Sequence, residues 1–180
     1  MITSMKRLGR KFFTRDALLV SKELLGKYLV RKIRGKIIAG KIVETEAYIG
    51  PEDKASHAFG GKRTARNEAE YLVGGHVYIY LVYGMHWQLN ISTGKEGSPE
   101  CVLIRALEPV YGPGILCRWL ELDKSFYAED LTKSKRLWLA APSGRASPRL
   151  KIWAGRRIGI DYAGPIWAKK PWRFYLESVK

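Results

Sequence analysis

The stretch Val43-Glu44-Thr45-Glu46-Ala47-Tyr48 is the most informative part of the sequence, because two kinds of side chain alternate along it. In an extended strand, successive side chains point to opposite faces of the sheet. Glu44, Glu46 and Tyr48 would therefore share one face. The pattern predicts a strand that presents two carboxylates and an aromatic ring on a single surface.

Residues 76–92 read as two alternating strands joined by a tight turn. Gly84 falls at the turn, and Tyr83 comes directly before it, so Tyr83 is expected at the tip of a hairpin. A large aromatic ring in that position would be exposed. Its exposure calls for a functional explanation.

A lone arginine interrupts the apolar run Cys101-Val102-Leu103-Ile104-Arg105-Ala106-Leu107. An unpaired charge within such a strand is costly, so Arg105 should either pair with an acid or face a ligand. An ion pair with Glu44 or Glu46 is compatible with ligand binding. Both alternatives place Arg105 near the two carboxylates.

The other elements follow from periodicity and turn residues. A helix capped by Thr14 would pack through Leu18, Leu19 and Leu25 and end at Gly26. Further expected elements are strands at 28–33 and 37–48, a short helix starting near residue 64, a strand at 101–106, a helix at 113–122, strands near 136–140 and 150–161, and a loop at 141–148.

Composition favours one domain that meets a polyanion. A chain of 180 residues with 46% hydrophobic content can bury one core, so a single domain spanning 1–180 is expected. Its 32 Lys and Arg against 17 Asp and Glu give a net charge of +15, and residues 131–180 hold 12 basic and 2 acidic residues. This balance favours nucleic acid as partner, although a solvated basic face or membrane-surface binding would give similar counts.

Cofactor chemistry has little support in the sequence. Cys101 and Cys117 are the only cysteines, and each is expected to be a small buried side chain. The three histidines and two cysteines lack metal-ligand spacing, so neither a metal nor another cofactor is expected. With no secretory signal or long apolar run, an intracellular protein that does not enter a membrane is expected.

Taken in order, the motifs closely resemble the alkyladenine (3-methyladenine) DNA glycosylases, a family of base-excision repair enzymes. The resemblance implies an α+β fold, with a curved, largely antiparallel sheet flanked by helices and a β-hairpin that inserts into DNA. The matching blocks are residues 11–13, 43–48, 50–57, 64–67, 83–85, 90–92, 103–109, 112–114, 157–164 and 172–175.

The activity implied is that of a monofunctional DNA glycosylase acting as a monomer on double-stranded DNA. Such an enzyme flips alkylated or deaminated purines, such as 3-methyladenine, 7-methylguanine, hypoxanthine or ethenoadenine, out of the duplex. Glu46 matches the family's catalytic glutamate, which activates water to hydrolyse the N-glycosidic bond. Arg105 matches the arginine that holds this water and the phosphate beside the lesion.

The resemblance also implies a base pocket and a wedge. Tyr48, His57 and Tyr80 would form this pocket. Aromatic faces would hold the flipped base, where a cationic alkylated base gains cation–π energy, and the His57 region would supply a hydrogen bond to the edge of the base. Asn90 would obstruct guanine's exocyclic amine, and Tyr83 would enter the minor groove. Ala55 completes the expected pocket, whereas His76 and His86 are expected to be structural.

Several positions depart from the family's usual sequence. Ile115 stands where a lysine is usual, and Arg118-Trp119 replaces smaller residues. Glu70-Tyr71 stands where a Met-Phe pair is common. These differences leave the shape of one pocket wall, and hence the range of damaged bases, undetermined.

Two alternatives remain from the residues alone. One is a non-catalytic nucleic-acid-binding protein, which the basic excess would suit. The other is a metal-dependent nuclease that uses Glu44, Glu46 and Asp53. A carboxylate beside Arg105 argues against the pure binder, because binding a polyanion gains nothing from a facing carboxylate.

Overall fold

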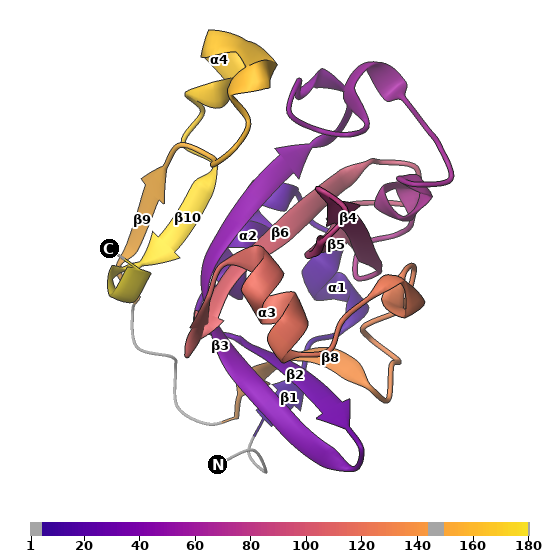
Figure 1. Cartoon of the computed structure of the whole chain (residues 1–180), viewed down its shortest axis with the longest axis vertical. Coiled ribbons are helices and arrows are strands. Elements are labelled where there is room, and N and C mark those ends of the chain that lie inside the picture. Colours follow the sequence, from indigo (N-terminus) through magenta and orange to yellow (C-terminus); the bar gives the residue numbers. More distant parts are fainter. Residues whose placement is uncertain (1–4, 144–149, 180) are drawn as a thin grey trace.

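The computed structural model describes residues 5–143 and 150–179. All paired strands in these ranges are antiparallel and belong to one curled sheet, whose main path runs β1-β8-β2-β3-β6-β5-β4 (Figure 1). The strands are β1 (Met5–Arg7), β2 (Tyr28–Ile33), β3 (Lys36–Ile49), β4 (Val77–Val82), β5 (His86–Thr93), β6 (Glu100–Glu108), β7 (Val110–Tyr111), β8 (Leu137–Pro142), β9 (Ile152–Gly155) and β10 (Arg173–Leu176). The expected α+β class is confirmed.

Four α-helices are present in the described ranges, and α2 and α3 contact the sheet most closely (Figure 1). They are α1 (Arg10–Phe13), α2 (Ala17–Leu24), α3 (Pro113–Trp119) and α4 (Gly164–Ala168). The main core lies between the sheet and α1, α2 and α3. None of the helices in the described part of the chain is long and apolar enough to cross a membrane.

Strand β3 is the centre of the architecture, because it pairs with β2, β6 and β10. It starts after a turn in which Arg34 and Gly35 both have positive φ, as a two-residue hairpin requires. Its Val43, Thr45 and Ala47 face α2, and the Thr45 hydroxyl donates to the carbonyl of Ser21 at 3.0 Å. The opposite face of β3, which carries Glu44, Glu46 and Tyr48, is left for a polar site.

Helix α2 differs from the sequence prediction at its start and on its buried face. Asp16, and not Thr14, is the N-cap, and it accepts a hydrogen bond from the Leu19 amide at 2.9 Å. The helix buries Val20 and Leu24, while Leu19 is 38% exposed. The buried face follows the i, i+3, i+4, i+7 spacing of Ala17, Val20, Ser21 and Leu24, so Leu19 points away from the core.

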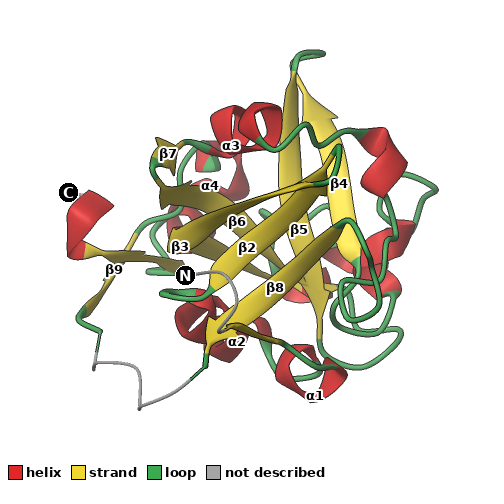
Figure 2. Ribbon diagram, turned by 90° about the horizontal axis from the view of Figure 1, so that it is seen from below, coloured by secondary structure: helices red, strands yellow, loops and turns green. Residues whose placement is uncertain are grey.

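The β4–β5 hairpin projects beyond the rest of the molecule (Figure 2). Its turn follows Val82, and Tyr83 and Gly84 both have positive φ, at 52° and 68°. This geometry leaves the Tyr83 side chain pointing outward, with 88% of the residue exposed, and Met85 beside it is 67% exposed. The tip is placed where the alternation predicted it, and its entry into DNA stays a prediction.

Local predictions were less accurate outside the long strands. The helix expected near residue 64 is a 3-10 turn over Glu68–Tyr71, because the Asn67 side chain accepts from the Thr64 amide and holds a loop instead. The helix expected to end at residue 122 ends at Trp119, and only Ile152–Gly155 of the expected strand at 150–161 is extended. Of the loop predicted at 141–148, residues 144–148 lie outside the described residues.

Candidate active site

Glu46 is completely buried on β3, and three donors surround its carboxylate. The Tyr48 hydroxyl donates to Oε2 at 2.8 Å, and the Ile158 amide donates to Oε1 at 2.8 Å. Arg105 Nη1, on the adjacent strand β6, lies 3.4 Å from Oε1. The alternation of β3 therefore brings together Glu46, Tyr48 and Arg105, as the sequence predicted.

The protonation of Glu46 depends on two opposing effects. Burial raises the pKa of the Glu46 carboxyl, while Arg105 and the hydrogen bonds from Ile158 and Tyr48 lower it. Burial and the adjacent Glu46 raise the pKa of Tyr48 well above its ordinary value, so its hydroxyl keeps its proton and remains a donor. The arrangement gives a carboxylate that accepts a proton more readily than an exposed glutamate does.

Glu44 supports the site through arginines. Its Oε1 lies 3.2 Å from Arg105 Nε and 2.8 Å from Arg173 Nη1 on β10. The guanidinium of Arg105 is therefore held between two carboxylates, and only 13% of its side chain is exposed. Glu44 therefore contacts the cluster through the guanidinium groups of Arg105 and Arg173.

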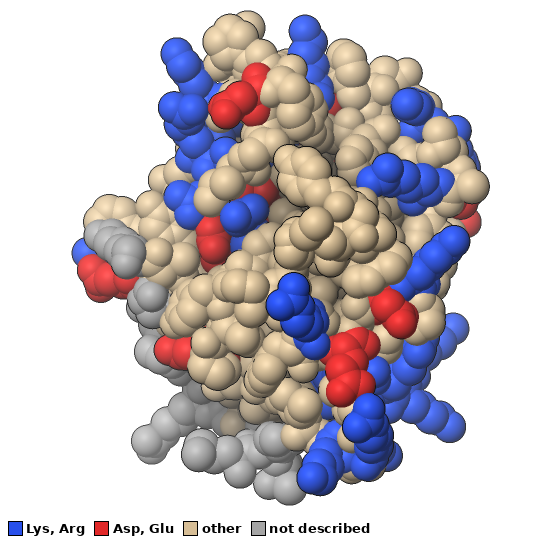
Figure 3. Space-filling model, viewed as in Figure 1, with Lys and Arg blue, Asp and Glu red and all other residues tan. Residues whose placement is uncertain are grey.

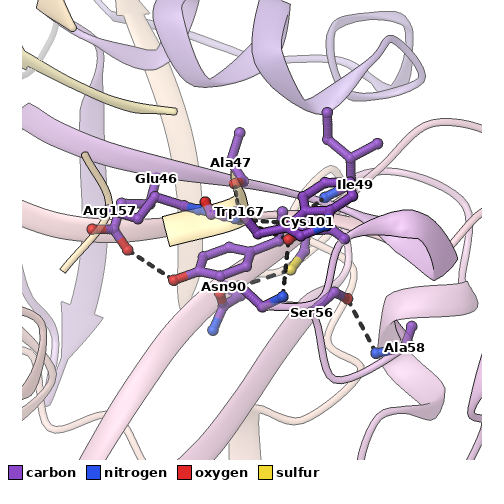
Figure 4. A network of polar contacts seen from close by, with 12 residues as sticks. Glu46, Ala47, Ile49, Ser56, Ala58, Asn90, Cys101, Arg157 and Trp167 are labelled. Carbon is purple, nitrogen blue, oxygen red and sulfur yellow. Dashed lines mark hydrogen bonds and ion pairs between the residues drawn. The ribbon is translucent and has the colours of Figure 1, made fainter. Parts of the chain in front are cut away.

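Arg157 is an anchor of the site that the sequence analysis missed. Its buried guanidinium binds Asp53 at 2.5 and 2.9 Å and donates to the Ala47 carbonyl at 3.0 Å (Figure 4). It also lies 4.7 Å from the Tyr48 ring centroid. Because Arg157 and Asp53 are 104 residues apart, local sequence patterns could not join them.

The carboxylates of the nuclease alternative are engaged by arginines. Asp53 binds Arg157, Glu44 binds Arg105 and Arg173, and Glu46 lies beside Arg105. Within residues 5–143 and 150–179, no group of three or more His, Cys, Asp or Glu side chains is placed to hold a metal ion. These carboxylates are arranged around guanidinium groups.

A cavity of about 470 Å³ opens beside the Glu46 cluster. Its volume falls in the range of about 300–1,000 Å³ that small-molecule sites occupy. Seven of the predicted site residues line it, and Glu46 lies behind Tyr48 and Arg105. The lining residues are Tyr48, Ala55, His57, Arg66, Glu70, Tyr78, Tyr80, Leu81, Val82, Tyr83, Gln88, Asn90, Leu103, Arg105, Ile158, Gly159, Ile160 and Tyr162.

An aromatic cluster forms one wall of the cavity. The ring of His57 meets that of Tyr80 edge to face at a centroid distance of 4.7 Å, and His57 Nδ1 lies 2.6 Å from the Tyr78 hydroxyl. Burial and the nearby Arg66 and Lys62 lower the pKa of His57, so its imidazole is neutral at pH 7. Tyr78 was missed because the β4 alternation alone could not distinguish it from packing tyrosines.

A polar floor adjoins this aromatic wall, since Asn90 on β5 lies opposite Tyr78 on β4. Asn90 is 1% exposed, and its amide nitrogen donates to the Gln88 carbonyl at 3.3 Å. The Cys101 thiol lies 3.8 Å from Asn90 Oδ1 and 3.4 Å from Glu70 Oε1 (Figure 4). Cys101 and Cys117 are both buried, as expected. Glu70, one of the positions that depart from the family's usual sequence, is part of this floor.

Ala55 contributes its backbone to the rim. Its amide donates to Asp53 Oδ1 at 3.0 Å, and its carbonyl accepts from the Tyr162 hydroxyl at 3.1 Å. Tyr162 was another missed residue, because an isolated tyrosine in the glycine-containing segment 159–164 carries no local pattern.

The remaining predicted positions lie outside the cavity lining. His76 contacts the Val73 carbonyl at 2.7 Å, and His86 packs against Gly114. Ile115 on α3 is 55% exposed, and Trp119 packs against the main core. Of the departures from the family pattern, only Glu70 lines the pocket itself.

A family profile and individual relatives agree on which known proteins this chain is similar to. The profile of the methylpurine-DNA glycosylase (MPG) family matches residues 11–180. A Desulfitobacterium hafniense (strain Y51) protein, provisionally named a 3-methyladenine DNA glycosylase, is 47% identical, with 97% of each chain covered. The DNA-3-methyladenine glycosylase of Mus musculus is 39% identical, and the match covers 96% of this chain and 60% of the mouse protein.

Proposed function

Because the chain belongs to the methylpurine-DNA glycosylase family and is therefore a hydrolase of N-glycosyl bonds in DNA, we propose that Glu46 activates the water that releases the base. The substrates proposed are alkylated or deaminated purines, including 3-methyladenine, 7-methylguanine, hypoxanthine and ethenoadenine. The observation that carries the proposal is the buried Glu46 carboxylate, held by Tyr48, Ile158 and Arg105 beside a cavity of about 470 Å³.

The proposed reaction is a hydrolysis. As the bond between the purine N9 and the sugar C1′ breaks, its electron pair leaves with the base and positive charge develops on the sugar. The water oxygen forms a bond to C1′, and the water proton passes to the Glu46 carboxylate. The carboxylates of Glu46 and Glu44 stabilise the developing cation. A cationic alkylated base leaves as a neutral molecule, whereas hypoxanthine or ethenoadenine leaves as an anion and takes up a proton from solvent. The proton on Glu46 returns to solvent, and the products are the free base and an abasic deoxyribose.

Arg105 positions the reacting groups in this proposal. Glu44 and Glu46 hold its guanidinium from two sides, and the residue also lines the cavity. Its remaining N–H groups can donate to a water or to a phosphate oxygen, because a guanidinium carries five donors. Loss of Arg105 would leave Glu44 and Glu46 without their shared partner.

Base recognition is assigned to the aromatic walls and to Asn90. Tyr48 on β3 and the His57–Tyr80 pair border the cavity, and an electron-poor alkylated purine stacks favourably on such rings. Asn90 on the floor would meet the exocyclic amine of guanine. Tyr83, exposed at the tip of the hairpin, would fill the space that the extruded nucleotide leaves in the duplex.

One assay tests the proposal against both alternatives. Duplex DNA with a single hypoxanthine is incubated with the protein in the presence of a chelator, and abasic sites are then revealed by hot alkali. Strand cleavage only after alkali supports the glycosylase. A non-catalytic binder would give no abasic sites, and a nuclease would cut undamaged strands and require metal; either result would overturn the proposal.

A further inference from the structure

The pocket floor carries a carboxyl group that the proposed chemistry at Glu46 does not use. Glu70 lines the cavity and is 1% exposed. Its Oε1 accepts a weak hydrogen bond from the Cys101 thiol at 3.4 Å, whereas its Oε2 is buried without a partner among the described residues. Native proteins rarely leave a buried carboxyl oxygen unpaired, so Glu70 keeps hydrogen-bonding capacity at the cavity that the described residues do not use.

The surroundings of Glu70 do not explain the carboxyl as half of an ion pair. Its polar neighbours include Tyr78 and Tyr80 on β4 and Cys101 on β6, and Asn67 from the preceding loop hydrogen-bonds to the carboxyl. No salt bridge to Glu70 forms among the residues that the structure describes. Burial raises the pKa of Glu70 to about 7, although Cys101 and Asn67 oppose the shift.

The position of Glu46 decides which edge of a bound purine reaches Glu70. The glycosidic bond must lie next to Glu46 and Arg105, since the reaction takes place there. The six-membered ring is the part of the purine farthest from the sugar, so its Watson–Crick edge enters first. Enzymes that extrude a base commonly read that edge by hydrogen bonds. The floor formed by Glu70 and Asn90, which the Cys101 thiol contacts from β6, is the surface that this edge would meet.

We propose that Glu70 determines specificity by accepting a hydrogen bond from an N–H group on the Watson–Crick edge of the extruded purine. The inference rests on the proposed function and narrows its substrates to purines that carry such a donor. Hypoxanthine offers N1–H, 3-methyladenine offers its 6-amino group, and 7-methylguanine offers N1–H and its 2-amino group. Ethenoadenine offers none, because its bridge ties N1 and N6 into a ring.

The requirement holds whether or not Glu70 is protonated. An ionised carboxylate only accepts hydrogen bonds, and a protonated carboxyl still has an accepting carbonyl oxygen. A purine without the N–H group leaves the buried acceptor unpaired in the complex. An unpaired buried group of this kind reduces binding about tenfold to a hundredfold.

The test compares two lesions in the same duplex. Single-turnover release of hypoxanthine and of ethenoadenine is measured at protein concentrations well below saturation, where the rate reports binding as well as chemistry, for the wild type, Glu70→Met and Glu70→Gln. The ratio of the hypoxanthine release rate to the ethenoadenine release rate should be at least about tenfold higher in the wild type than in Glu70→Met. Glu70→Gln keeps a carbonyl acceptor of the same shape and should retain the preference of the wild type.

Each result distinguishes this inference from the proposed function. A wild type that releases neither base refutes the proposed function. Release of both bases with the same hypoxanthine-to-ethenoadenine ratio in the wild type and Glu70→Met overturns the role of Glu70 alone. If Glu70→Met does not fold, the wild type decides: a clear preference for hypoxanthine supports the inference, and equal release rates overturn it.

Discussion

At the scale of single residues, burial sets the chemistry of the site. Glu46 is fully buried, yet its carboxylate has a hydroxyl, an amide and a guanidinium within reach. Burial raises the pKa of the Glu46 carboxyl, and the three donors oppose that shift. The pKa stays above that of an ordinary glutamate, so the carboxylate accepts a proton more readily than an exposed one does.

Glu46→Gln should abolish base release and leave binding to lesion DNA intact, because the amide keeps the shape but cannot accept the proton. The expected loss in single-turnover excision is about 10²–10⁴-fold. In the wild type, excision should fall as the pH drops through the pKa of Glu46, which lies above that of an ordinary glutamate. Excision by the variant within tenfold of the wild type would contradict the role of Glu46.

Glu70 should make stability depend on pH. Its pKa is about 7 in the folded protein and 4.5 in a model carboxyl, so the folded state binds more protons between these values. Stability is therefore expected to fall as the pH rises from about 4.5 to 7, by at most about 3 kcal/mol. Glu70→Gln removes this dependence. The melting temperature of the variant should be higher than that of the wild type at pH 8, but the two should not differ in this way at pH 5. An equal difference at both pH values would show that burial does not disfavour the ionised form.

At the scale of elements, the strands that were predicted best are those whose own sequences specify them. The alternation in β3 and the turn residues of the β4–β5 hairpin suffice to orient Glu46 and Tyr83. The pairing of β10 with β3 is not local, because Arg173 lies opposite Glu46 across 127 residues. The contacts of Arg157, Tyr162 and Arg173 with the site could therefore be found only in the folded chain.

Tyr83→Ala should weaken excision through base flipping and not through the chemical step. The hairpin holds this ring outside the sheet, so its loss removes the wedge while leaving the Glu46 cluster in place. Opening the base stack costs a few kcal/mol, and the wedge offsets this cost. The fluorescence of ethenoadenine in duplex DNA reports flipping on binding. An unchanged fluorescence signal in the variant would argue against the wedge.

Asp53→Asn should destabilise the connection between β3 and the segment that leads to α4. The substitution leaves the Arg157 guanidinium buried without its carboxylate partner, and breaking such a pair costs about 3–5 kcal/mol. Urea unfolding followed by circular dichroism measures the change. Glu23→Gln, which disrupts an exposed pair with Arg15, is the matched control and should cost less than about 1 kcal/mol. Similar losses in the two variants would contradict the anchoring role of Arg157.

At the scale of the whole molecule, the projecting β4–β5 hairpin and the surrounding Lys and Arg side chains suit the binding of a large anion. The hairpin tip projects from the face shown in Figure 3, where many Lys and Arg side chains lie toward the margin of a less charged centre. Not every cation in the basic C-terminal part is available to DNA. Arg173 binds Glu44, and Lys170 lies over the rings of Trp167 and Trp172. Lys169 next to them is exposed.

Affinity for undamaged duplex should fall steeply with salt, because bound DNA releases condensed cations when Lys and Arg contact its phosphates. Six phosphate contacts would give a slope of about −5 in a plot of log K against log salt. Lys169→Ala should make this slope shallower by about 1. Lys36→Ala is the control, since Lys36 lies in the β2–β3 hairpin at the other end of the long axis from α4 (Figure 1). Fluorescence anisotropy over a salt series measures both slopes. A slope near zero in the wild type, or an equal change of slope in the two variants, would mean that the face bearing the β4–β5 hairpin and α4 does not bind the DNA backbone.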